Sequence, residues 1–206
     1  MFSLFKIEQC GIRKTLYILN KRIVSWLDYN TDVYSYVKSQ GAKLGKNVCF
    51  ITLPHSKYPT SWPIFASEAF LVSIGDNTIV SFNCTFITHD GSIDLLRKNY
   101  DPQIANSVFT IGEIKIGNNC FIGCNTTILP NVTIGDNSII GAGSVVTKNI
   151  PSGEVWAGCP ARFIRKTSDL ADKYLEQNKT PEMNQLKEKY KGEVHWIMTP
   201  KGKIKF

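Results

Sequence analysis

The strongest constraint on the fold is an aliphatic residue that recurs every six positions without a gap. Its copies are Ile116, Ile122, Ile128, Ile134, Ile140 and Val146. Ile74, Val80 and Phe86 continue the pattern upstream, and residues 44–50 ("LGKNVCF") resemble a still earlier copy. A period of six matches neither the 3.6 residues of a helix nor the alternation of a strand. Such a chain must send one side chain inward per repeat and turn in between, so it coils.

The residues around the aliphatic position support a coil with three repeats per turn. Glycine follows the aliphatic residue in four of the six downstream copies, at positions 117, 123, 135 and 141. The residue four positions after it is mostly small, as in Cys120, Thr126, Ser138 and Ser144. About eighteen residues per turn form a triangular prism filled by the aliphatic residues, with glycine and small residues at tight corners.

The repeat resembles that of the left-handed β-helix, hexapeptide-repeat acyltransferases. The similarity covers residues 44–166 and is most specific in "IGAGSVVTKNIPSGEVWAGCPARFIRK" (140–166). Residues 67–92 and 114–137 are similar to the branch of sugar and cell-surface-polysaccharide O-acetyltransferases. The resemblance implies an all-β fold, a left-handed parallel β-helix, with an extruded loop and short helical N- and C-terminal extensions. It also implies acetyl-CoA as acetyl donor, a saccharide or nucleotide-sugar acceptor, and a homotrimer with active sites between subunits.

The ends of the chain lie outside this resemblance. Residues 1–43 are expected to form a helical cap, and residues 167–206 a C-terminal helix, broken near Pro181, followed by a basic tail. The expected role of the C-terminal extension is to cover the prism or a neighbouring subunit, because an open coil end exposes unpaired backbone groups.

Charge and cysteine usage limit the partners and the compartment. The net charge of +7 favours an anionic partner, and no helix-turn-helix, zinc-finger or RNP-like motif suggests nucleic acid. A phosphate-bearing donor accounts for the charge. The six cysteines form no CxxC pair, which indicates reduced thiols in a cytoplasmic protein. Charged residues interrupt every apolar run near the N-terminus, so neither a signal peptide nor stable membrane insertion is expected; a basic amphipathic helix there could instead touch a membrane surface.

The repeat fails after His89. The in-phase positions 92, 98, 104 and 110 are Ser, Lys, Ile and Thr, which predicts a loop over about residues 90–110. Acyl transfer from a thioester to a hydroxyl needs a base, and an imidazole can take the hydroxyl proton and return it to the leaving thiolate. The resemblance places a catalytic histidine beside such a loop, and His89 matches it.

A carboxylate that orients the imidazole would strengthen this base. Asp90, Asp94, Asp101 and Glu113 all lie near His89 in the sequence, and Asp94 is slightly favoured. Asn83 and Asp90 are expected to contact the acceptor.

The donor site is expected near the end of the coil. In the resemblance, small residues line the pantetheine path and basic residues lie near the nucleotide. The residues that match are Gly123, Gly141, Ala142, Gly143, Thr147, Lys148, Pro160, Arg162 and Arg165.

Several other functions remain open. Acetylation of an amino sugar on a nucleotide carrier and O-acetylation of an antibiotic would use the same machinery. A metal-dependent hydratase of the carbonic anhydrase kind needs three histidines around zinc, whereas only His89 lies within the repeat, so no metal site is predicted. A non-catalytic scaffold would need neither His89 at the break nor the donor segment.

Overall fold

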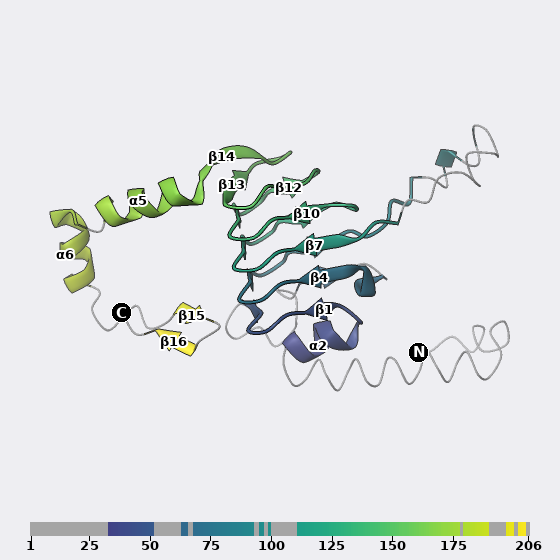
Figure 1. Ribbon diagram of the computed structural model, residues 1–206, viewed down its shortest axis with the longest axis horizontal. Coiled ribbons are helices and arrows are strands. Elements are labelled where there is room, and N and C mark those ends of the chain that lie inside the picture. The colour runs from purple at the N-terminus through teal and green to yellow at the C-terminus, as the bar shows by residue number, and fades with distance from the viewer. Residues whose placement is uncertain are drawn as a thin grey trace.

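The computed structural model describes residues 33–51, 63–65, 68–92, 95–96, 99, 111–177, 179–189, 197–199 and 202–204. Three stacks of short strands surround a common axis (Figure 1), and the strands of each stack are parallel except β14, which runs antiparallel to β13. Sheet A contains β1 (Lys43–Leu44), β4 (Val72–Ile74), β7 (Ile114–Ile116) and β10 (Thr133–Ile134). Sheet B contains, in spatial order, β2 (Cys49–Phe50), β5 (Ile79–Val80), β8 (Phe121–Ile122), β11 (Ile139–Ile140), β13 (Glu154–Ala157) and β14 (Arg162–Lys166). Sheet C contains β3 (Ile64–Phe65), β6 (Thr85–Phe86), β9 (Thr127–Ile128) and β12 (Val145–Val146).

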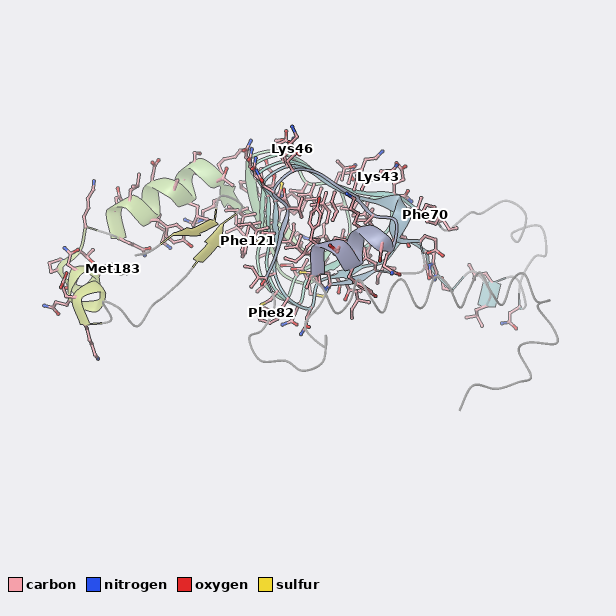
Figure 2. All side chains as sticks on the ribbon, turned by 90° about the horizontal axis from the view of Figure 1, so that it is seen from below. Lys43, Lys46, Phe70, Phe82, Phe121 and Met183 are labelled. Carbon is pink, nitrogen blue, oxygen red and sulfur yellow. The ribbon has the colours of Figure 1, made fainter. Side chains whose placement is uncertain are left out.

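The register of these sheets confirms three repeats per turn. Ile116 pairs with Ile134 in sheet A, Ile122 with Ile140 in sheet B, and Ile128 with Val146 in sheet C. Each pair is separated by eighteen residues, because the chain visits the three sheets in turn. Figure 2 shows the coil end-on as a triangle, with Lys46 at the A–B corner, Phe82 at the B–C corner and Phe70 at the C–A corner. The arrangement fits the predicted left-handed β-helix.

The aliphatic residues of the repeat fill the prism. The fully enclosed members include Val80, Phe86, Ile122, Ile128, Ile134 and Ile140. The small residues four positions later are also interior rather than at the corners. Thr78 donates its hydroxyl to the carbonyl of Gly117 at 2.8 Å, and Ser138 donates to that of Pro151 at 2.9 Å. These residues therefore fill narrow space and also satisfy buried carbonyl groups of the backbone.

Asparagine, rather than glycine, occupies most of the left-handed corner positions. Seven asparagines three positions after the inward-facing residue have a φ between +54° and +62°; they are Asn47, Asn77, Asn83, Asn119, Asn125, Asn131 and Asn137. Asparagine tolerates this conformation better than other residues with a Cβ. Glycine is needed at the preceding turn, where coils approach closely: a Cβ on Gly123 would lie 2.5 Å from the backbone nitrogen of Ala142.

The two ends of the coil differ. Helix α2 (Val33–Ser39) covers the first turn, with Val37 buried and Tyr34 packed against the core. Helices α5 (Thr167–Gln177) and α6 (Pro181–Lys189) project away from the coil instead (Figure 1), and no residue of α5 is buried. The expectation that this extension covers its own prism is therefore wrong for α5, whereas the break at Pro181 is confirmed.

The basic tail contains a hairpin of β15 (Ile197–Thr199) and β16 (Gly202–Ile204). Among the helices that the structure describes, none has the length and apolar character needed to cross a bilayer.

Candidate active site

The chain leaves the coil at the C–A corner, directly after β6. The number of residues between stacked partners in sheet C shows this departure. Ile128 pairs with Val146, eighteen residues later, but Phe86 pairs with Ile128, forty-two residues later. The loop therefore adds 24 residues to one turn. An antiparallel bridge between His89 and Ile111 closes its base, and the N–H of Gly112 donates to the carbonyl of Thr88 at 2.7 Å. The backbone of His89 is thus held on the coil at the predicted break.

The His89 side chain pairs with Glu68, on the coil below. Its Nδ1 lies 2.7 Å from Oε2 of Glu68, which precedes a 3₁₀ turn, η1 (Ala69–Leu71). The same carboxylate oxygen accepts a hydrogen bond from the buried hydroxyl of Thr88 at 2.9 Å. The His89 side chain is 44% exposed and that of Glu68 is 21% exposed. The pair is therefore anchored from inside the coil and open to a substrate from outside.

The contact with Glu68 determines which nitrogen of the His89 imidazole carries the proton. A carboxylate accepts hydrogen bonds, so it favours the tautomer in which Nδ1 carries the proton. Nε2 is then the nitrogen that can accept a proton from a substrate. This is the division of roles in a carboxylate–histidine base, where the carboxylate fixes orientation and stabilises the imidazolium.

Sequence reasoning missed Glu68 because it searched only near His89 along the chain. The pairing follows from the register of the structure: Glu68 and His89 are 21 residues apart, as are the paired residues Ile64 and Thr85 of β3 and β6, whereas the repeat of six gives an offset of eighteen. Residues with that offset lie one above the other on successive coils.

The carboxylates considered from the sequence have other positions. Asp94, the favoured one, and Asp101 lie outside the described residues. Glu113 contacts Lys115 at 2.5 Å. Asp90 accepts a hydrogen bond from the N–H of Ser92 at 2.9 Å, and this bond lowers the pKa of its carboxyl group.

The two residues expected to contact the acceptor are not adjacent. Asp90 directly follows His89 at the C–A corner, whereas Asn83 lies at the B–C corner, at the other end of β6. Oδ1 of Asn83 is buried and has no hydrogen-bond partner within the described part of the chain. Asn83 therefore has an unused acceptor, but only Asp90 stands beside the histidine.

The segments expected to bind the donor come together at the C-terminal end of the coil. The turn 141–144 joins β11 to β12, and the turn 158–161 joins β13 to β14. Val145 donates its N–H to the carbonyl of Gly158 at 2.9 Å, and Ala161 donates to the carbonyl of Val145 at 2.8 Å. The exposed residues Ala142, Gly143 and Pro160 thus lie on two linked turns, and the bond before Pro160 is cis; Thr147, also exposed, directly follows β12.

Two of the predicted donor-site glycines have a packing role in the coil. Gly123 is buried under Ala142. A Cβ on Gly141 would lie 2.8 Å from Cβ of Ala157, so larger side chains are excluded at both positions.

The predicted cations lie around the last turn of the coil. Nζ of Lys148 lies 5.3 Å from the ring centroid of Trp156, which closes the end of the buried ladder. Arg162 and Arg165 belong to β14, and Nη1 of Arg162 donates to the carbonyl of Ala161 at 3.0 Å. Lys166 on the same strand is paired with Glu154 at 2.6 Å, and this contact helps to lower the pKa of the Glu154 carboxyl group.

His89 and Lys148 share the C–A edge of the prism, whereas the turns 141–144 and 158–161 follow strands of sheet B and lie at the B–C corner. Thr88 and Lys148 each follow a strand of sheet C by two residues, and those strands, β6 and β12, are separated only by β9. Two strand spacings amount to about 10 Å. A molecule lying along the C–A corner can therefore reach from Lys148 to His89.

Comparison with known proteins identifies similar chains. The family model "Bacterial transferase hexapeptide (six repeats)" matches residues 113–148. Protein CapG of Staphylococcus aureus is 41% identical over 140 residues, which are 68% of this chain and 74% of CapG. Galactoside O-acetyltransferase of Escherichia coli strain K12 is 44% identical over 108 residues, or 52% of this chain and half of that enzyme.

A solved structure of galactoside acetyltransferase in complex with coenzyme A is also similar. It has a TM-score of 0.50 and 31% identity, and the match covers 75% of this chain and 82% of that one. Gamma carbonic anhydrase 1 of Arabidopsis thaliana is 35% identical over 117 residues, 53% of this chain and 42% of that protein. The described residues contain no group of three His, Cys, Asp or Glu side chains placed to hold a metal ion.

Proposed function

This chain belongs to the bacterial transferase hexapeptide family, and from that premise we propose that it moves an acetyl group from acetyl-CoA to a hydroxyl of a saccharide. The acceptor belongs to a cell-surface polysaccharide, such as a capsule or O-antigen, or to its precursor. The observation that carries the reaction type is the His89–Glu68 pair at the base of the extruded loop. The similarity to galactoside O-acetyltransferase supports a sugar hydroxyl as acceptor.

In the proposed reaction, Nε2 of His89 takes the proton of the acceptor hydroxyl while its oxygen attacks the thioester carbonyl carbon. Glu68 holds the imidazole through Nδ1 and stabilises the imidazolium that forms. The tetrahedral intermediate collapses with cleavage of the carbon–sulfur bond, and the imidazolium returns the proton to the thiolate. The products are the acetyl ester and coenzyme A, with no covalent enzyme intermediate.

The donor is proposed to bind against the last turns of the coil, with its phosphates toward the C-terminal end. Lys148 at the C–A corner and Arg162 and Arg165 on β14 supply positive charge, and the turns 141–144 and 158–161 at the B–C corner present backbone groups with small side chains. The thioester end then faces the coil that carries His89. Acetyl-CoA supplies the activated acetyl group, and the protein supplies its position and the base.

A homotrimer with sites between subunits is part of the proposal. The His89 side chain is 44% exposed in the single chain, so a second subunit against this corner would exclude water from the reaction.

N-acetylation of a nucleotide-linked amino sugar and O-acetylation of an antibiotic remain the alternatives for the acceptor. Similarity to a carbonic anhydrase raises a zinc hydratase as a different reaction, but this would need three metal ligands, and Nδ1 of His89 is already paired with Glu68.

The test is thiol release from acetyl-CoA by the wild type and by His89→Ala. The panel contains methyl β-galactoside, glucosamine, UDP-N-acetylglucosamine and capsule-derived oligosaccharides. Wild type is expected to release thiol only with a saccharide, and His89→Ala is expected to lose about 10²–10⁴-fold in rate. His89→Ala should still bind coenzyme A with unchanged affinity in a calorimetric titration. Near-normal release by His89→Ala would contradict the proposed mechanism.

A further inference from the structure

Phe70 is a large aromatic side chain that the coil leaves outside. Its neighbour Ala69 is 2% exposed and Val72 is fully buried, whereas Phe70 is 56% exposed. Figure 2 shows Phe70 at the C–A corner, the corner from which the extruded loop leaves. Single exposed hydrophobic residues are common on protein surfaces, but this ring stands at the corner of the proposed base, where a bound substrate would remove its apolar surface from water.

The backbone fixes Phe70 close to the His89–Glu68 pair. Phe70 is two residues from Glu68 in the turn η1, which is closed by a bond from the N–H of Leu71 to the carbonyl of Glu68 at 2.9 Å. Strand β4 begins two residues after Phe70, and its first residue, Val72, pairs with Ile114, two residues after Gly112. Gly112 in turn donates to the carbonyl of Thr88, the residue before His89.

Along the coil axis, Phe70 lies on the N-terminal side of the His89–Glu68 pair. Cβ of Phe70 is 3.3 Å from the point where a Cβ on Gly41 would be, so Phe70 rests on the link between α2 and β1. This link belongs to the coil below Glu68, toward the N-terminal end. The segments proposed for the donor are two strands above β6, toward the C-terminal end. The base therefore has donor residues on one side and Phe70 on the other.

We propose that Phe70 is the platform on which the acceptor sugar ring stacks, so that one hydroxyl of the ring meets Nε2 of His89. The inference rests on the proposed acetyl transfer to a saccharide. The face of an aromatic ring carries partial negative charge and attracts the partly positive C–H groups on one face of a pyranose. Stacking of this kind selects acceptors with a continuous C–H face, and it fixes the ring plane while leaving the hydroxyl edge for Asp90 and His89.

Steady-state kinetics on the full-length protein separate this role from a structural one. The variants are Phe70→Leu, which keeps an apolar side chain, and Phe70→Trp, which keeps an aromatic face. Tyr174→Leu is the matched control, because Tyr174 is 55% exposed but lies on α5, which projects away from the coil. The probes are methyl β-galactoside and capsule-derived oligosaccharides with acetyl-CoA as donor. Size-exclusion chromatography measures whether each variant keeps the assembly state of the wild type.

Phe70→Leu is expected to raise the KM for the saccharide about 3- to 10-fold while leaving the KM for acetyl-CoA unchanged. Phe70→Trp is expected to restore the saccharide KM, and Tyr174→Leu to leave both constants at wild-type values. An unchanged saccharide KM in Phe70→Leu, or a tryptophan variant no better than leucine, would overturn the role of Phe70. A wild type that releases no thiol with any saccharide would instead overturn the proposed function, and the inference with it.

Discussion

Oε2 of Glu68 accepts hydrogen bonds from both His89 and Thr88, and this shared oxygen is the most informative contact of the site. The Thr88 hydroxyl is buried and can hold the carboxylate in place from within the coil. The imidazole is then oriented from a rigid element, although it starts a loop. Orientation by packed neighbours is what a general base needs, because small displacements of a base are costly in rate.

Glu68→Gln is predicted to lower kcat by about 10²–10⁴-fold, because a glutamine amide can donate to Nδ1 and so place the proton on Nε2. The KM for acetyl-CoA and the melting temperature are expected to stay near the wild-type values. Kinetics with a saccharide acceptor measure this, with Glu113→Gln as a surface control that loses only its contact with Lys115. A kcat within twofold of wild type would show that Glu68 does not orient the base.

Among the residues of the candidate site, the sequence singled out His89 but not its partner Glu68. His89 stood out because a regular pattern stopped there, whereas Glu68 follows β3, in a stretch where the repeat is weak. The partner is set by the offset of 21 residues between β3 and β6 rather than by distance along the chain. Three repeats of six residues predict an offset of eighteen residues between stacked positions, so the pairing of Glu68 with His89 could be recognised only from the structure.

The elements of the coil follow closely from the repeat. Each strand is only two to five residues long within the three stacked sheets, and the in-phase aliphatic residues point inward as predicted. The corners were predicted less well, because glycine was taken as their main residue. Asparagine instead holds the left-handed conformation at seven described corner positions. The asparagines were visible in phase in the sequence, but a pattern of hydrophobic residues gives no information on φ.

Asn125 provides a direct test of the corner conformation, since its φ is +57° and its side chain is exposed. Asn125→Ala is predicted to lower the free energy of unfolding by about 1–2 kcal/mol, because a Cβ without a local polar group is strained in this region. Asn125→Gly is predicted to stay close to wild type, because glycine adopts positive φ freely. Urea unfolding measures both. Thr133→Ala, on an exposed strand position, is the control, and equal losses in alanine and glycine variants would contradict the assignment.

The molecule as a whole is a rigid prism with different ends. Helix α2 closes the first turn, while α5 and α6 project from the last one (Figure 1). Composition predicted these terminal helices, but where they lie depends on tertiary contacts that a polar helix pattern does not encode.

Rigidity of the prism also predicts that the buried thiols are protected together. Burial raises the pKa of Cys84 to about 11, and it also raises the pKa of Cys120.

Iodoacetamide labelling at pH 8, with the modified peptides read by mass spectrometry, is predicted to modify the exposed Cys159 before the other cysteines in the described part of the chain. Cys84 and Cys120 are expected to react at least about 100-fold more slowly, because they are buried and mostly protonated at this pH. Both should become reactive together in denaturing urea. Labelling of Cys84 as fast as Cys159 in the native protein would contradict a closed prism.

The central claim is that His89, held by Glu68, activates a sugar hydroxyl for attack on acetyl-CoA. The most direct measurement is the fate of the acetyl group, followed by ¹³C NMR with acetyl-CoA labelled at the carbonyl carbon. With wild type and a saccharide acceptor, the account predicts a new ester signal that disappears in mild base, and no such signal with His89→Ala. An amide signal stable to base would reassign the acceptor to an amine. An ester formed equally well by His89→Ala would contradict the account.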